Sequence, residues 1–194
     1  VQLVKSPYAQ AAREYLTGRK VSEEYLRKFG LGYAPIGRDT LGRYLISKGY
    51  DPELLRAACL IGGDEHRTYD RFFNRVMFPI FDVRGRVIAF GGRVIGKGEP
   101  KYLNSSDTEL FNKRKNLYAM NLAKKSRRPQ ALMVEGYMDV FSLHQAGFDN
   151  AVASLGTALT PEQAVLLKRY FEEVCLVYDS DAAGPNAARR AIPI

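Results

Sequence analysis

The sequence predicts an α+β subdomain over residues 1–128, followed by an α/β subdomain with a parallel sheet over residues 129–194. Two observations lead to this fold class. In the first subdomain, apolar residues recur at helical spacing over residues 1–63 and then form β-rich runs over residues 64–128. In the second, short apolar runs alternate with helical segments, which is the pattern of β-α-β units.

Four helices are predicted over residues 1–63, because four capping signals each precede apolar residues at helical spacing. Ser6-Pro7 and Asp51-Pro52 each place a capping side chain before a proline at the first helical position. Ser22 and Asp39 are expected to cap the second and third helices. The segment Leu-Gly-Tyr-Ala-Pro at 31–35 is expected to be a connecting loop.

A β-hairpin is predicted next, because two β-rich runs at 75–81 and 86–95 are separated by a short turn. Gly91-Gly92 interrupts the second run and predicts a bulge or the close approach of a ligand. Residues 97–118 are expected to form a polar, basic loop, and residues 116–125 a helix.

The last third of the chain alternates three apolar runs with three helical segments. The runs lie at residues 131–134, 151–155 and 175–178. The helical segments lie at residues 140–146, 161–170 and 184–191. Strands joined in this way run parallel, with right-handed crossovers. Because the chain starts at Val1 and stops soon after its last helical segment, we expect a piece of a longer protein, with this sheet truncated at its carboxyl end.

Carboxylates follow the first and third strands of this sheet. Glu135 ends the first run, and Asp179 and Asp181 follow the third, where alternation in an extended chain points both the same way. Ligands bind at the carboxyl ends of strands in open α/β sheets, and carboxylates that converge there repel one another unless a cation lies among them. Oxygen ligands without His or Cys favour Mg²⁺ or Mn²⁺ over Zn²⁺, which suggests metal-assisted phosphoryl or nucleotidyl transfer.

Asp139 lies four positions after Glu135 and is expected to be a weaker or more distant ligand at the same edge. The alternative for each of these carboxylates is a structural role, because an acidic residue after a strand often only caps the following helix.

Charge is divided unevenly along the chain. Residues 1–128 carry 25 Lys and Arg against 13 Asp and Glu, a net charge of +12, whereas residues 129–194 carry 4 against 8, a net charge of −4. A basic half joined to an acidic half suggests a surface that binds a polyanion beside a metal site. The alternative is a basic surface that serves solubility alone.

Several other classes of protein are excluded by what the sequence lacks. No apolar run is long enough to span a bilayer and no signal-peptide pattern is present, so we expect a cytoplasmic protein with no membrane partner. Cys59 and Cys175 lie far apart without metal spacing, and Cys175 falls in a strand predicted to be buried. His66 and His144 lack partners for a triad or a zinc site and are expected to be structural or solvated.

Two sequence patterns resemble known families. Glu-Gly-x-x-Asp at 135–139 with Asp-x-Asp-x-x-Gly at 179–184 resembles the Toprim domain, the catalytic module shared by bacterial-type primases, topoisomerases and some nucleases. Further segments resemble the bacterial replicative DNA primases in particular. These segments are Leu31–Pro35, Tyr69–Phe72, Arg75–Asp82, Gly85–Arg93, Pro100–Ser105 and Glu135–Asp139.

The resemblance implies a DNA-directed RNA polymerase core that makes RNA primers on single-stranded DNA from ribonucleoside triphosphates at the replication fork. It assigns Glu135, Asp179 and Asp181 as catalytic residues that bind Mg²⁺ or Mn²⁺, with Asp139 as a further metal ligand. Residues that match the family's nucleotide- or nucleic-acid-binding positions are Arg71, Arg75, Arg93, Lys101, Tyr102, Asn104 and Lys113.

Three parts of the primase family have no match in this sequence: a zinc-binding domain, a further acidic motif, and the part that binds the replicative helicase of the primosome. We therefore expect no zinc here, and weak or no primer synthesis from this fragment alone. Two alternatives stay open, namely Toprim-type strand cleavage by a nuclease or topoisomerase, and a non-catalytic nucleic-acid-binding fragment.

Overall fold

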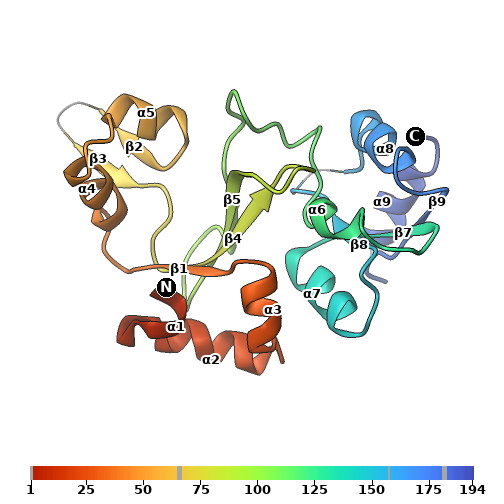
Figure 1. Cartoon of the computed structure of the whole chain (residues 1–194), viewed down its shortest axis with the longest axis horizontal. Helices are drawn as coiled ribbons and strands as arrows, with labels where there is room; N and C mark the ends of the chain where they lie inside the picture. The colour runs from red at the N-terminus through yellow and green to blue at the C-terminus, as the bar shows by residue number, and fades with distance from the viewer. Residues whose placement is uncertain (1, 65–66, 157, 181–182) are drawn as a thin grey trace. The chain divides into compact units, whose positions relative to one another are not determined.

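The computed structural model describes residues 2–64, 67–156, 158–180 and 183–194. The chain forms two compact units: unit 1 holds residues 1–79 and 89–110, and unit 2 holds residues 80–88 and 111–194. Figure 1 shows their helices and strands. The predicted division at residue 128 stays a prediction. Among the described residues, no helix is both long and apolar enough to cross a bilayer.

Unit 1 combines short helices with two antiparallel sheets (Figure 1). Its helices are α1 (Gln2–Lys5), the 3-10 helix η1 (Pro7–Ala9), α2 (Gln10–Gly18), α3 (Glu23–Lys28), α4 (Thr40–Ser47) and α5 (Pro52–Ala57). A four-stranded sheet has the order β1 (Gly32–Ala34), β4 (Arg75–Phe81), β5 (Val87–Val94) and β6 (Tyr102–Asn104). A second sheet pairs β2 (Ile61–Gly63) with β3 (Thr68–Asp70). The tip of the β4–β5 hairpin belongs to unit 2.

Three predictions about helical and irregular segments of unit 1 are wrong. The predicted helical region contains strands β1 and β2, and the predicted loop at 31–35 contains β1. The predicted loop at 97–118 contains β6. Strands β1 and β6 are three residues long and pair with β4 and β5, so their hydrogen-bond partners lie elsewhere in the chain and leave no local signal.

The predicted bulge at Gly91-Gly92 is also wrong, because β5 runs through both glycines and stays in register with β6. Gly92 is needed for a different reason. A Cβ atom at this position would lie 2.9 Å from the Phe72 ring and 2.9 Å from Cδ of Arg75. The close approach comes from side chains of the protein itself.

The N-terminus of α4 is capped by a residue that lies far away in the sequence. Asp39 is the N-cap residue by position, but its side chain makes no capping bond and pairs with Arg43 on the surface. The carboxylate of Asp70, at the end of β3, accepts hydrogen bonds from the backbone N–H groups of Leu41 (2.7 Å) and Gly42 (2.8 Å). Because Asp70 is only 2% exposed, this charge-assisted cap joins α4 firmly to the β2–β3 sheet.

Replacing Asp70 by asparagine is expected to lower the free energy of unfolding by about 1–3 kcal/mol, because one backbone N–H would then face an amide NH₂ group in a buried site. The matched control is Asp39→Asn, which removes only an exposed ion pair and is expected to cost less than about 1 kcal/mol. Chemical denaturation of the two variants measures the difference. Equal losses would show that the buried cap at Asp70 stabilises the fold no more than the exposed Asp39–Arg43 pair does.

Unit 2 contains the predicted parallel sheet, with the order β8 (Ala151–Ala153), β7 (Gln130–Val134) and β9 (Glu173–Leu176) (Figure 1). Both pairings are parallel, which confirms the predicted β-α-β-α-β arrangement. Its helices are α6 (Met120–Ala123), α7 (Tyr137–Gln145), α8 (Pro161–Lys168) and α9 (Ala183–Ala191). The predicted helix at 116–125 is only the four-residue α6, because Ala119 has a left-handed backbone conformation (φ 63°) and Tyr118 bridges to Ala153.

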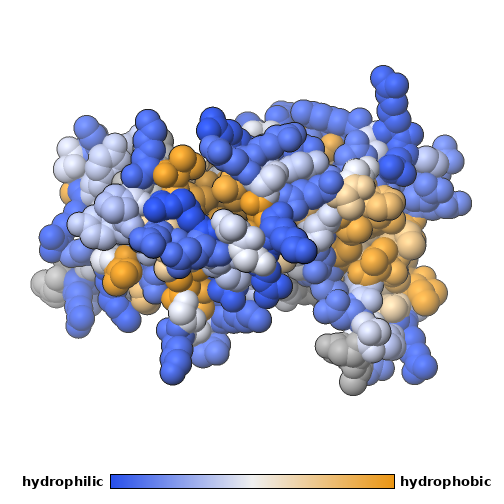
Figure 2. Space-filling model, turned by 90° about the horizontal axis from the view of Figure 1, so that it is seen from below, coloured by the Kyte–Doolittle hydropathy of each residue, from blue (hydrophilic) through white to orange (hydrophobic). Residues whose placement is uncertain are grey.

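β7 is the buried centre of this sheet, whereas β9 lies at its edge. Ala131 and Met133 on β7 are fully buried. On β9, Val174 is 41% exposed and Cys175 is exposed, so the expectation of a buried strand and thiol there is wrong. Figure 2 shows exposed apolar atoms of unit 2 on its right-hand side. His144 is buried, with Nε2 2.9 Å from the carbonyl of Ala151, as expected for a structural histidine, whereas His66 lies outside the described residues.

Candidate active site

The carboxyl edge of the parallel sheet brings Glu135 and Asp179 together. Glu135 follows the last residue of β7, and Asp179 comes three residues after the end of β9. The backbone N–H of Asp179 donates to Oε1 of Glu135 at 3.1 Å. Both side chains are exposed, so the two carboxylates, 44 residues apart in the sequence, reach solvent at one place. Asp181 lies outside the described residues.

Asp139 has a structural contact at the same end of the sheet. Its Oδ2 accepts a hydrogen bond from the backbone N–H of Gly136 at 3.0 Å, at the start of α7. The capping alternative therefore applies to Asp139, while its role as a metal ligand stays a prediction. Within the described ranges, no three His, Cys, Asp or Glu side chains converge closely enough to hold a metal ion.

The donors at this edge fit a hard cation. The Asp179 carboxylate has no hydrogen-bond or ion-pair partner among the described residues, and Glu135 uses one oxygen for a single backbone bond. Nearby, burial and, to a lesser degree, the Glu135 carboxylate raise the pKa of Tyr178, so this phenol stays neutral and adds no charge. Oxygen donors with open lone pairs suit Mg²⁺ or Mn²⁺.

Gly184 sets the backbone position of Asp179. A Cβ atom on this buried glycine would lie 1.7 Å from the carbonyl oxygen of Asp179 and 2.8 Å from its carbonyl carbon. The start of α9 therefore packs directly on the backbone that carries the carboxylate. The sequence pattern contains this glycine, but only the structure gives the physical reason for it.

In unit 1, two of the predicted binding residues, Arg93 and Tyr102, lie beside the aromatic ring of Tyr15. The Arg93 guanidinium carbon lies 3.8 Å from the centre of the Tyr15 ring, and that of Arg19 lies 5.7 Å from it. Arg93 and Tyr102 face each other in the β5–β6 register. Burial raises the pKa of Tyr102 to about 12, and the adjoining Tyr15 hydroxyl adds to this rise. We call Tyr15, Arg19, Arg93 and Tyr102 the Tyr15 cluster.

Tyr15 and Arg19 were not among the predicted site residues. Both come from the α2 segment, where Tyr15 belongs to the apolar helical spacing and Arg19 follows the last helical residue. No local pattern separates them from an ordinary helix. A cation held against an aromatic face by about 0.5–2 kcal/mol is a contact that only the folded chain reveals.

Arg75 differs from the other predicted binding residues, because it is only 4% exposed. Its Nη1 donates to the carbonyl oxygens of Gly92 (3.1 Å) and Pro100 (2.9 Å). Burial and the neighbouring Arg71 lower the pKa of this guanidinium. Through these bonds Arg75 joins β5 to the segment that precedes β6. This segment carries the exposed Lys101.

The remaining predicted binding residues lie on different elements. Arg71 follows β3 and is half-buried, and Asn104 ends β6 opposite Gly91. Lys113 lies in unit 2, in a turn at residues 112–116. The structure thus brings Arg93 and Tyr102 together in unit 1 and places Lys113 in the other unit.

Unit 1 also contains an apolar cavity of about 670 Å³. Its lining includes Tyr33, Leu41, Tyr44, Phe72, Met77 and Phe90. The acidic group in the lining is Asp70, and both of its oxygens already accept hydrogen bonds from α4. The cavity therefore offers apolar surface, and its buried carboxylate is committed to the helix cap.

Comparison with known proteins agrees with this geometry. Residues 1–124 match the family described as the DNA primase catalytic core, N-terminal domain, and residues 130–194 match the Toprim domain. A DNA primase of Clostridium acetobutylicum is 49% identical over 184 residues, which cover 94% of this chain and 31% of that protein. The chain spans about a third of the length of the curated relatives it matches.

Solved structures give the same result. A DNA primase domain from Pseudomonas aeruginosa superposes with a TM-score of 0.91 at 45% identity, covering 98% of this chain and 61% of that one. The DnaG primase catalytic domain bound to single-stranded DNA superposes with a TM-score of 0.89 at 45% identity, with the same coverage.

The parallel sheet with carboxylates at its carboxyl edge, together with the match over residues 130–194, defines a Toprim protein. The match over residues 1–124 then decides among the families that share this module. The chain belongs to the DNA primase family, whose catalytic core it matches in the N-terminal domain and the Toprim domain. The predicted fold class and the resemblance to primases are confirmed.

Proposed function

We propose that this chain supplies the nucleotidyl-transfer site of an enzyme that makes RNA primers on single-stranded DNA during replication. The observation that carries the proposal is the contact between Glu135 and the backbone of Asp179 at the carboxyl edge of a Toprim sheet. Membership of the primase family narrows the reaction to primer synthesis. A primase relative that binds single-stranded DNA supports the choice of template.

In this proposal Glu135, Asp179 and Asp181 hold Mg²⁺ or Mn²⁺, with Asp139 nearby. When bound, the ion supplies positive charge that polarises phosphate oxygens. Glu135 also accepts the backbone N–H of Asp179, so one side chain fixes the second strand end while it offers its other oxygen to the metal.

The basic residues bind phosphate groups of the ribonucleoside triphosphates, the template and the growing RNA. Arg71, Arg93 and Lys101 act directly, whereas Arg75 acts by fixing the segment that carries Lys101. Tyr102 and Asn104 complete this surface, and we add Tyr15 and Arg19 because they contact or adjoin Arg93 and Tyr102. Lys113, which lies in unit 2, also binds phosphate in this proposal. Template contacts of this kind are independent of sequence, because base pairing reads the template.

The test is a primer-synthesis assay with the full-length primase that carries this sequence. The protein is incubated with single-stranded DNA, labelled ribonucleotides and Mg²⁺ or Mn²⁺, with and without a chelator. Short labelled RNA that depends on the metal supports the proposal. Cut DNA without RNA would instead indicate strand cleavage, and a DNA complex without either product would indicate a binding protein.

Replacing Arg93 by alanine is expected to lower kcat/KM for ribonucleotides roughly 10- to 100-fold, because a charge-assisted contact of about 1.5–3 kcal/mol is lost. The control is Lys124→Ala, which removes a cation at the end of α6, outside the proposed surface. Steady-state kinetics of the two variants measure the ranking. Small and equal effects would remove Arg93 from the nucleotide site.

A further inference from the structure

The N-terminus of α8 carries a capping box made of two buried side chains. Oγ1 of Thr160 accepts the backbone N–H of Gln163 at 3.1 Å, and Oε1 of Gln163 accepts the backbone N–H of Thr160 at 3.2 Å. Thr160 is 7% exposed and Gln163 is fully buried. These two bonds satisfy the cap of the helix. They leave the Thr160 hydroxyl hydrogen and both amide hydrogens of Gln163 for other partners.

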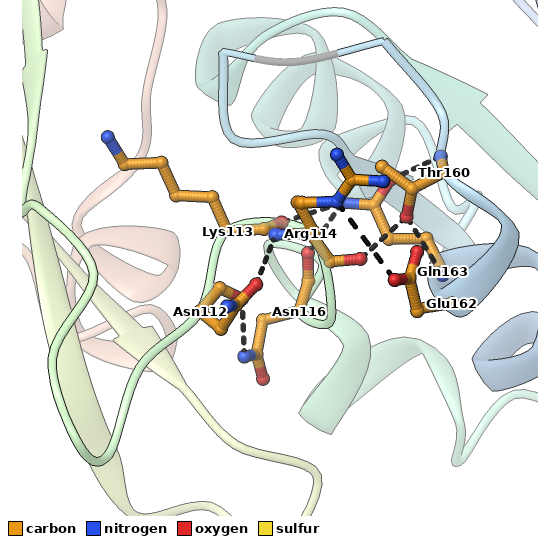
Figure 3. A network of polar contacts seen from close by, with 7 residues as sticks. All are labelled: Asn112, Lys113, Arg114, Asn116, Thr160, Glu162 and Gln163. Atoms are coloured by element: carbon orange, nitrogen blue, oxygen red, sulfur yellow. Dashed lines mark hydrogen bonds and ion pairs between the residues drawn. The ribbon is translucent and has the colours of Figure 1, made fainter.

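All three remaining donors bind one distant turn (Figure 3). Nε2 of Gln163 donates to the carbonyl oxygens of Lys113 and Asn116, each at 2.9 Å. The Thr160 hydroxyl donates to the carbonyl oxygen of Arg114 at 2.6 Å. Two side chains at the N-terminus of α8 therefore bind three of the carbonyls in a turn that lies about 50 residues earlier in the chain.

The turn is also fixed from within. The side chain of Asn112 accepts the backbone N–H of Arg114 at 2.9 Å, and the side chain of Asn116 donates to the carbonyl of Asn112 at 2.9 Å. Gln163 is fully buried and Thr160 is 7% exposed, so leaving their donors unpaired would be costly. These donors therefore favour the one backbone conformation of residues 112–116 that presents the three carbonyls to them.

The two basic side chains of this turn point in different directions. In Figure 3, the Arg114 guanidinium lies toward Glu162, which it approaches to 4.0 Å in an exposed pair. The Lys113 side chain extends away from the network, although its own carbonyl is bound by Gln163 (Figure 3). The hydrogen bond from Gln163 thus fixes the backbone at Lys113, while the Lys113 ammonium group points away from this network.

We propose that Gln163, together with Thr160, is a positioning residue that directs Lys113 toward phosphate groups of the template or of the incoming nucleotide. The inference rests on the proposed function, in which Lys113 binds phosphate. A lysine offers a point charge on a flexible stem, so the backbone at its base decides where that charge can reach. Gln163 has to be an amide, because its side chain must accept one hydrogen bond and donate two.

The test uses Gln163→Glu, Lys113→Ala and the double variant in the full-length primase. Glutamate keeps the size of the side chain and the acceptor for Thr160, but it turns an oxygen toward the carbonyls of Lys113 and Asn116. Two readouts separate the two sources of phosphate. They are the Kd for single-stranded DNA over a range of salt concentrations, and the KM for ribonucleotides at saturating template.

We expect Gln163→Glu to weaken the same readout as Lys113→Ala, by roughly 3- to 10-fold. If that readout is template binding, the slope of log Kd against log salt falls by about 0.7 in both variants, as expected for one lost contact with a single strand. The double variant should be no worse than Lys113→Ala alone, because the two residues act through one contact.

Losses that add in the double variant would overturn the positioning role and leave the proposed function intact. If Lys113→Ala changes neither readout, both the phosphate role of Lys113 and this inference fail.

Thr160→Ser and Thr160→Val test the same set of hydrogen bonds without introducing a buried charge. Serine keeps the hydroxyl and should retain wild-type affinity, whereas valine should match Gln163→Glu. Wild-type behaviour of Thr160→Val would count against the inference.

Discussion

Glu135→Gln is expected to reduce primer synthesis on the order of a hundredfold or more, since even residues that only support a metal ligand cost 10- to 100-fold when lost. The substitution changes little else. A glutamine oxygen can still accept the backbone N–H of Asp179, so the ends of β7 and β9 stay together while one negative charge is removed. The measurement is labelled RNA product from the full-length primase, with a thermal melt to confirm folding.

The matched control for this change is Glu173→Gln. Glu173 is an exposed glutamate at the opposite, amino end of β9, where it cannot share a ligand with Asp179. It should keep wild-type synthesis. Adding a chelator to the wild type should stop synthesis while DNA binding persists, and Mn²⁺ should restore it. Full activity of Glu135→Gln would mean that this carboxylate only links two strands.

Gly184→Ala is expected to be as damaging as the loss of a carboxylate, although it adds a single methyl group. The new Cβ atom would lie 1.7 Å from the carbonyl oxygen of Asp179, a backbone atom that cannot move aside as a flexible side chain could. Either α9 or the segment after β9 must shift, which moves the Asp179 carboxylate. We expect a loss of about 1–3 kcal/mol in unfolding free energy, together with strongly reduced primer synthesis.

The control for this effect is the same substitution at an uncrowded glycine. Gly18 is the last residue of α2, and a Cβ atom there would meet no other atom within 4 Å. Gly18→Ala should leave synthesis unchanged and stabilise the protein slightly, because alanine restricts the unfolded chain more than glycine does. Equal behaviour of the two variants would show that the backbone of Asp179 adapts without cost.

The elements that could be predicted from the sequence are those whose signal is local. The parallel strands around Met133 and Val152 are short apolar runs between helical segments, and the β4–β5 hairpin is two β-rich runs around a turn. The pairing of Glu135 with Asp179 followed from topology, because the carboxyl ends of parallel strands meet at one edge.

The features that were missed depend on partners far away in the chain. β1 and β6 exist because β4 and β5 offer hydrogen bonds to them. The cap of α4 comes from Asp70 and not from Asp39. The buried Asp70 carboxylate accepts the backbone N–H groups at the helix end, which the sequence alone assigns to the neighbouring Asp39. Arg75 matched a family position, yet its donors are bound by backbone carbonyls, which no spacing of residues could indicate.

The edge position of β9 affects how a preparation of this chain behaves in the test tube. β9 pairs with β7 along one side, and among the described residues no strand pairs with its other side. An unpaired edge with exposed apolar side chains such as Val174 is a template for a second molecule and therefore promotes aggregation. The net charge of +8 opposes this self-association by repulsion between molecules, and salt screens that repulsion. Concentrated stocks in high-salt buffer are therefore the conditions that most favour precipitation.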